Sequence, residues 1–167
     1  SVVSFDMVLD DVAIQQAFKG RWTREDYVNT FRNLSKGKAQ VVPHILVGLR
    51  KGVIAGEYEA LDFLIGEGVQ KVIFIVLIPT KGTEWENVPP PSPEEVARLL
   101  AWARLNKPSL NISLGCMRPG GRYRRHLDVL AVKAGVDRIV LPHPDAVAEA
   151  RSRGLVIVRK GECCALE

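Results

Sequence analysis

The apolar run "KVIFIVLI" at residues 71–78 constrains the fold more than any other feature of this chain. It shows no alternation of polar and apolar side chains, so a strand with this sequence must be covered on both faces. Related runs lie at 2–8, 41–49, 111–116 and 138–141, and stretches with helical spacing separate them. Buried strands that alternate with helices are typical of parallel βα units, so the pattern predicts an α/β fold.

The helices are expected at 26–34, 57–65, 93–104, 123–133 and 144–153, and a last short strand is expected at 155–158. No glycine-rich dinucleotide turn follows the first strand, which disfavours an open doubly wound sheet. We therefore predict part of a (β/α) barrel that occupies residues 1–167 without a second domain. In a barrel of this kind the loops that follow the strands carry the functional site.

Composition and charge exclude several classes of protein. Hydrophobic residues make up 47% of the chain and charged residues 25%, which is typical of a globular protein and not of a disordered one. The net charge of +4 is spread along the chain, so no nucleic-acid partner is expected. No apolar stretch is long enough to span a bilayer, so no membrane is expected either. Three cysteines without a secretory context favour a reducing, cytoplasmic location.

The segment between the apolar run and the next helix is unusually elaborate. Pro79-Thr80-Lys81-Gly82-Thr83 leaves the strand at the functional end of a parallel sheet, and Gly82 permits a turn in which backbone amides approach a ligand. Three prolines at 89–91 stiffen the loop, and Ser92 and Glu95 form a capping box that starts the helix. A rigid connector without a ligand is the alternative interpretation.

Three stretches carry a resemblance to a known family. The sequence "VIFIVLIPTKGTEWENVPPPSPEEVARLLAWARL" resembles the sixth strand, loop and helix of radical S-adenosylmethionine (SAM) enzymes of the biotin synthase type. "PHILVGL" is similar to the fifth strand of that family, and "NISLGCMRPGGRYRRHLDVLAVKAGVDRIVLP" to its seventh strand, the following helix and the eighth strand. The resemblance implies that the chain is the C-terminal half of a radical SAM TIM-type barrel, from about strand 4 to strand 8.

This resemblance implies a biotin- or lipoyl-synthase-like transferase with SAM and a 4Fe-4S cluster as cofactors. Such an enzyme generates a 5'-deoxyadenosyl radical for hydrogen abstraction, with sulfur insertion as the favoured outcome. The Cys-x3-Cys-x2-Cys loop that holds the cluster is absent here, and its ligands are expected in a missing N-terminal half. The chain begins with Ser1 directly before a predicted strand, so we expect a fragment or processed product that is inactive alone.

Side-chain alternation along the strands predicts which residues face the inside of the barrel. It places Ile112, Leu114, Cys116 and Arg118 on one face of the strand at 111–116, and it directs Asp6, His44, Cys116 and Arg118 into a common hollow. Cys116, Arg118 and His44 are therefore the catalytic candidates, and Arg118 falls where the resemblance implies an arginine beside a second cluster. Guanidinium groups on the loop that follows this strand suit a carboxylate or phosphate substrate.

The resemblance also implies cofactor contacts. Asp6 matches a position that binds the SAM ribose hydroxyls, Leu46 and Gly48 match a segment beside the adenine, and Glu57 loosely matches an acidic position that follows. Cys116, Cys163 and Cys164 are candidate ligands of a second Fe-S cluster or another soft metal. Adjacent side chains of an extended chain project apart, so Cys163 and Cys164 can bind one metal only if the backbone turns there.

The expected partners are a small-molecule or lipoyl/biotin-type substrate and either the missing N-terminal half or a second copy. Two alternatives stay open at this stage. One is a non-catalytic half-barrel that binds an anionic metabolite or a protein partner. The other is an aldolase-like barrel fragment that uses Lys71 or Lys81 as a Schiff base.

Overall fold

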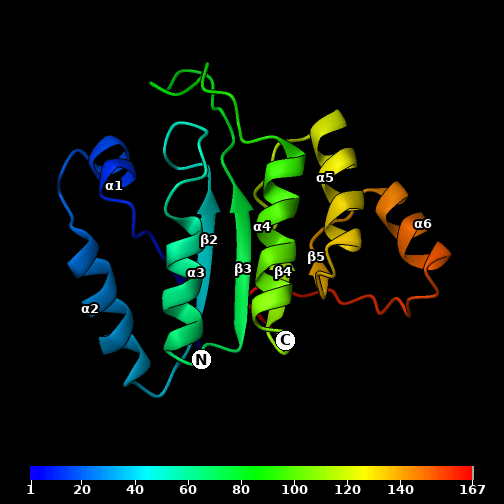
Figure 1. Ribbon diagram of the computed structural model, residues 1–167, viewed down its shortest axis with the longest axis horizontal. Helices are drawn as coiled ribbons and strands as arrows, with labels where there is room; N and C mark the ends of the chain where they lie inside the picture. The colour runs from blue at the N-terminus through cyan, green and yellow to red at the C-terminus, as the bar shows by residue number, and fades with distance from the viewer. Residues whose placement is uncertain (167) are drawn as a thin grey trace.

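The apolar runs pair into one parallel sheet with five strands in the order β1-β2-β3-β4-β5. The computed structural model describes residues 1–166. The strands are β1 (Val2–Asp6), β2 (Gln40–Val47), β3 (Lys71–Val76), β4 (Asn111–Leu114) and β5 (Arg138–Ile139). Each strand pairs with the strand before it in the chain, so the sheet grows in one direction only (Figure 1). The predicted α/β fold with parallel (β/α) units is confirmed, and the sheet is consistent with half of a barrel.

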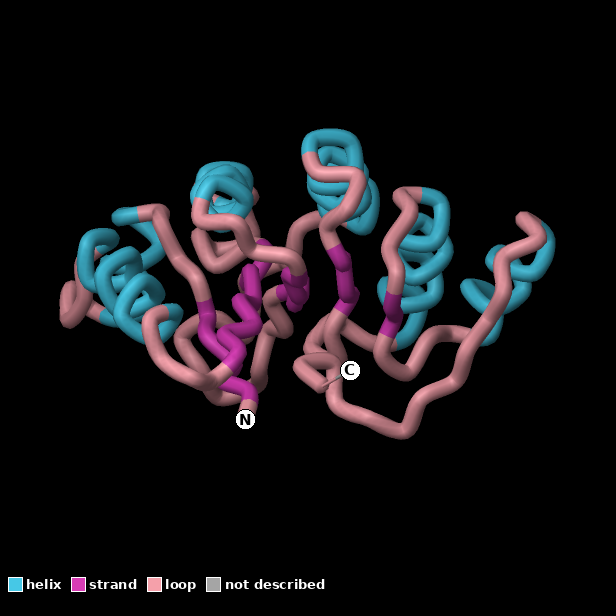
Figure 2. The backbone as a smooth tube through the Cα atoms, turned by 90° about the horizontal axis from the view of Figure 1, so that it is seen from below, coloured by secondary structure: helices cyan, strands magenta, loops and turns pink. Residues whose placement is uncertain are grey.

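The helices lie on one side of this sheet. They are α1 (Asp11–Phe18), α2 (Arg24–Ser35), α3 (Glu57–Gly66), α4 (Pro93–Asn106), α5 (Gly121–Lys133) and α6 (Pro144–Ser152). Figure 2 shows them as an outer arc around the inner arc of strands, and the chain after α6 returns across the concave side. Within residues 1–166, every helix is too short or too polar to cross a bilayer.

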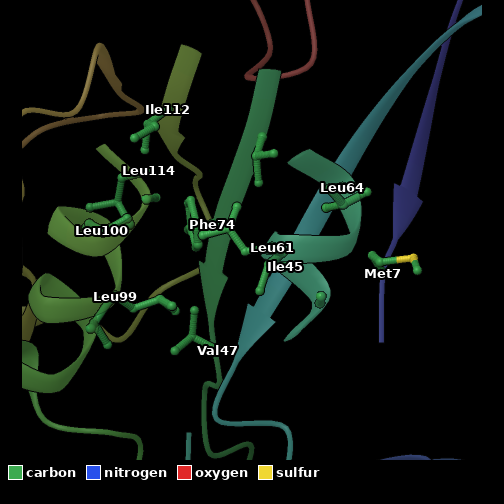
Figure 3. Close-up of a cluster of buried hydrophobic side chains, with 14 of the residues drawn as sticks. Met7, Ile45, Val47, Leu61, Leu64, Phe74, Leu99, Leu100, Ile112 and Leu114 are labelled. Carbon is green, nitrogen blue, oxygen red and sulfur yellow. The ribbon is translucent and has the colours of Figure 1, made fainter. Parts of the chain in front are cut away.

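The main hydrophobic core fills the space between the convex face of the sheet and the helices. Ile45 and Val47 of β2 and Phe74 of β3 meet the leucines of α3 and α4, and Figure 3 shows this packing. Each fully buried side chain of this size contributes roughly 1.5–3 kcal/mol to stability. Ile112 and Leu114 of β4 belong to the same core. The expectation that these two side chains share the inner face with Cys116 and Arg118 is therefore wrong.

Two elements differ from the expectation. Helix α1 was not predicted; the Asp10 side chain caps it by accepting hydrogen bonds from the backbone amides of Val12 and Ala13. The strand predicted at 155–158 is absent, and these residues are exposed and extended. They follow α6 and pair with no strand among the described residues. The chain continues as a tail, residues 155–166, toward the concave face (Figure 2).

The loop between β3 and α4 owes its form to close packing against the loop between β2 and α3. Gly48 lies so near Pro91 that a Cβ atom there would stand 2.5 Å from the proline ring. Gly52 is tighter still, because its Cβ would lie 2.0 Å from the Pro89 carbonyl oxygen. Ser92 and Glu95 form the predicted capping box, with reciprocal hydrogen bonds between side chain and backbone. Prolines on one loop and glycines on the other thus fix both loops above the sheet.

We expect Gly52→Ala to lower the free energy of unfolding by about 2–4 kcal/mol, since the new Cβ would clash with Pro89 at a backbone φ of +84°. Gly82→Ala is the matched control. Its φ of +82° is nearly the same but nothing lies within 4 Å, so it should cost only about 1 kcal/mol. Urea unfolding of both variants checks the difference. Equal losses would show that the Pro89 contact contributes nothing.

Candidate functional site

A row of register partners crosses the concave face of the sheet, from the last residue of β1 to the first residue of β5. Asp6 pairs with His44, His44 with Ile73, Ile73 with Ser113 and Ser113 with Arg138. Register partners in a parallel sheet point to the same face. Ile73 packs against Cys164 and Ala165 of the tail, not against the helices, so this face is the concave one. A carboxylate, an imidazole, a hydroxyl and a guanidinium thus lie along one line, with a single apolar member.

The structure brings the predicted pair Asp6 and His44 together. Asp6 is exposed, whereas His44 is 8% exposed. The Nδ1 atom of His44 lies 3.1 Å from the Val42 carbonyl oxygen, which only accepts, so Nδ1 carries the hydrogen and Nε2 is left as an acceptor. Burial lowers the pKa of His44, and this effect outweighs the opposing influence of the Val42 hydrogen bond and the Asp6 carboxylate. The ring is therefore neutral at pH 7 and suited to accept a hydrogen bond or a proton.

The tail covers the amino-terminal part of the concave face. Lys71, the first residue of β3, donates from Nζ to the carbonyl oxygens of Ala165 (3.4 Å) and Leu166 (3.3 Å). Arg138, the first residue of β5, donates to the Leu166 carbonyl oxygen at 2.5 Å. Two cations of the concave face therefore hold the end of the tail. This arrangement also argues against Lys71 as a Schiff base, because its ammonium is engaged by backbone carbonyls.

Arg118 does not join the row. Its side chain is buried on the other side of the sheet and forms an ion pair with Asp128 of α5, at 2.7 Å from Nε to Oδ1 and 2.9 Å from Nη2 to Oδ2. Nη1 donates to the Gly115 carbonyl oxygen and Nη2 also to that of Val140. The guanidinium is thus fully used inside the protein. The prediction that Asp6, His44, Cys116 and Arg118 share one hollow is therefore wrong for Arg118, which pairs with Asp128 of α5 while Ser113 and Gly115 hold the inward positions on β4 and just after it.

The three cysteines lie near one another but differ in burial, and the backbone amide of Cys116 donates a hydrogen bond to the thiol of Cys164. Cys116 is exposed after β4, whereas Cys163 and Cys164 lie in a turn that the Leu166 amide closes by donating to the Cys163 carbonyl oxygen at 3.0 Å. Their sulfur atoms are 3.9 Å apart. Backbone hydrogen bonding from Ala165, the Cys164 thiol and the charge of Lys71 lower the pKa of Cys163, and burial raises that of Cys164. In the part of the chain that the structure describes, no group of three or more His, Cys, Asp or Glu side chains is arranged to hold a metal.

The other residues predicted to contact a cofactor lie above β2. Glu57 is buried and accepts hydrogen bonds from the amides of Gly48 and Ala55, each at 2.7 Å, while burial raises its pKa. Packing between the loop after β2 and the loop after β3 therefore accounts for the buried Glu57 carboxylate and for a glycine at position 48. Leu46 lines a cavity of about 20 Å³ at the carboxyl ends of β1 and β2, which holds about one water molecule. A nucleoside does not fit there, whereas a pocket of about 320 Å³, lined by Gln16, Lys19, Thr80, Glu84 and Trp85, lies between α1 and the loop after β3.

Sequence reasoning missed Ser113 and Arg138. Ser113 is fully buried, and its hydroxyl has no hydrogen-bond partner among the described residues. The signal for Ser113 was present in "NISLG", where Ile and Leu alternate with Ser and Gly. Assigning the apolar pair to the helix side would have placed Ser113 and Gly115 in the barrel. Gly115 is required there, since a Cβ would lie 2.7 Å from the Ile75 side chain.

Comparison with known proteins gives a partial similarity. No family model matches the sequence. Over 91 residues the chain is 35% identical to biotin synthase of Acetivibrio thermocellus, a match that covers 54% of this chain and 28% of that protein. The similarity supports a relationship to the radical SAM superfamily and nothing finer. The chain thus matches well under a third of the length of that enzyme.

We expect His44 to make the protein less stable in acid. Its pKa is lower in the folded than in the unfolded state, so stability is lost as the pH falls from the unfolded value of about 6.5 toward the lowered folded value. His44→Gln removes this loss, and its free energy of unfolding should fall less than that of the wild type between pH 7.5 and pH 5. The exposed His126, varied to Gln, is the control. Parallel pH profiles for the wild type and His44→Gln would contradict the assignment.

We expect Asp128→Asn to destabilise the protein by about 3–5 kcal/mol, because it leaves the buried Arg118 guanidinium without its counter-charge. Glu84→Gln breaks the exposed ion pair with Lys19 and should change stability little. Thermal and urea unfolding measure both effects. An Asp128→Asn variant as stable as the wild type would return Arg118 to the set of candidate substrate ligands.

Proposed function

We propose that this chain is the C-terminal part of a radical SAM enzyme of the biotin/lipoyl synthase type. The row of polar side chains on the concave face of a parallel half-barrel carries the proposal, and the partial similarity to biotin synthase supports it. In that family SAM and a reduced 4Fe-4S cluster supply a radical that abstracts hydrogen, and sulfur insertion is the favoured outcome. Thiolate ligands for such a cluster would come from residues other than the cysteines described here.

The residues of this chain would bind and orient the substrates. Asp6 is exposed at the carboxyl end of β1, where a carboxylate can accept two hydrogen bonds from ribose hydroxyls. His44 lies next to it and offers its Nε2 atom as an acceptor. Ile73 and the tail residues that pack against it form an apolar surface on the concave face. This surface would keep water away from a reactive intermediate.

The edges of the sheet support a partner. Strand β1 pairs only with β2 among the described residues, so its outer backbone groups face no strand. Unpaired edges of this kind favour the addition of further strands. We propose that the remaining strands of the barrel, from an N-terminal half or a second copy of the chain, complete the sheet here.

The test uses the full-length protein as its gene encodes it, reconstituted with iron and sulfide without oxygen. Formation of 5'-deoxyadenosine from SAM is measured for the wild type, Asp6→Asn and, as a control, Asp11→Asn on the exposed start of α1. Loss of charge-assisted hydrogen bonds should raise the KM for SAM by roughly ten- to a hundredfold in Asp6→Asn only.

Absence of any SAM-derived product, together with unaltered SAM binding in Asp6→Asn, would overturn the proposal. Tight binding of an organic anion by a protein that leaves SAM intact would instead support a half-barrel that binds a metabolite without catalysis.

A further inference from the structure

The turn at residues 163–166 places two thiols on the same side of the chain. Adjacent residues usually project apart, but the hydrogen bond from the Leu166 amide to the Cys163 carbonyl oxygen bends the backbone so that the sulfur atoms lie 3.9 Å apart. Two thiolates bound to one tetrahedral metal at about 2.3 Å lie roughly 3.8 Å apart. The spacing in the turn therefore already matches that of a bidentate thiolate site.

The turn is also held firmly in place. Lys71 donates to the carbonyl oxygens of Ala165 and Leu166, and Arg138 donates to those of Cys163 and Leu166. Cys164 and Ala165 are buried against Val42 and Ile73. The backbone that carries both thiols is thus fixed from two strands, and two positive charges lie near enough to offset the charge of two thiolates.

A buried polar group lies beneath this turn. Ser113 stands in register between Ile73 and Arg138, and both of these residues contact the turn. The Ser113 hydroxyl is fully buried and has no hydrogen-bond partner within residues 1–166. Buried hydroxyls nearly always have a partner, so an unpaired one at this position indicates that a further polar group belongs here. A water molecule or an oxygen donor attached to a bound ion would supply it.

We propose that Cys163 and Cys164 form a dithiolate site for a thiophilic divalent metal ion of the Zn²⁺ class. Binding releases the thiol protons, and the metal gains two sulfur ligands from the turn and takes its remaining ligands from water or oxygen donors. Cys116 lies beside the turn, because its backbone amide donates a hydrogen bond to the Cys164 thiol, but its exposed side chain is not one of the two proposed ligands. The site is independent of the proposed function, because it needs neither SAM nor any further strands.

The experiment titrates the reduced 167-residue chain with Co²⁺ in the absence of oxygen and follows the sulfur-to-cobalt charge-transfer absorption, with Zn²⁺ as competitor. We expect saturation at one metal ion per chain. Cys163→Ser and Cys164→Ala should each weaken binding by more than roughly a hundredfold. Cys164→Ala keeps the apolar packing of that side chain, and far-ultraviolet circular dichroism with a urea midpoint confirms that each variant is folded.

Cys116→Ser is the matched control, because it removes a thiol close to the turn that is not one of the two proposed ligands. It should change the affinity by less than about threefold. Absence of the absorption in the wild type would overturn the proposal. So would a loss in Cys116→Ser as large as that in Cys163→Ser, or full binding in either turn variant.

Discussion

The alternation of side chains across a parallel sheet determines the rest of this structure. All the long helices pack on the convex face, so the apolar residues that point there are fully buried. The residues between them point to a concave face that no helix covers. That face must be covered by other chain segments or by polar side chains, and this protein uses both. Val42 and Ile73 lie beneath the tail, while Asp6, which the tail does not reach, is exposed and charged.

The sequence contained most of the fold and about half of the site. The apolar runs located the strands within a few residues, and the capping box at Ser92 located the start of α4 correctly. On β1 and β2, alternation placed Asp6 and His44 on one face, and the structure pairs them. On β4 the same reasoning failed because the polar residues Cys116 and Arg118 were assumed to continue the inner face. Ile112 and Leu114 point toward the helices because that side of the sheet holds the hydrophobic core. This requirement decides which residues of β4 face the concave side.

Other features depend on contacts that no local pattern contains. Arg118 follows a strand and precedes a glycine turn, which is also typical of a substrate-binding arginine. Only the position of α5 shows that Asp128 neutralises it in the interior. The tail is similar, because residues 155–158 have the composition of a strand but pair with no strand in the described part of the chain. Its course across the sheet is set by Lys71 and Arg138, which are far away in the sequence.

The tail also determines where a ligand has room. It contacts the first residues of β3 and β5, and its Cys164 thiol meets the Cys116 amide after the end of β4, so it covers the concave face of β3 to β5. The carboxyl ends stay open beside Asp6, where ligands of parallel (β/α) barrels bind. Additional strands that pair with the free edge of β1 would enlarge the concave surface without displacing the tail. The position of the tail is therefore compatible with a completed barrel. The turn with Cys163 and Cys164 would then lie on the inner surface of that barrel.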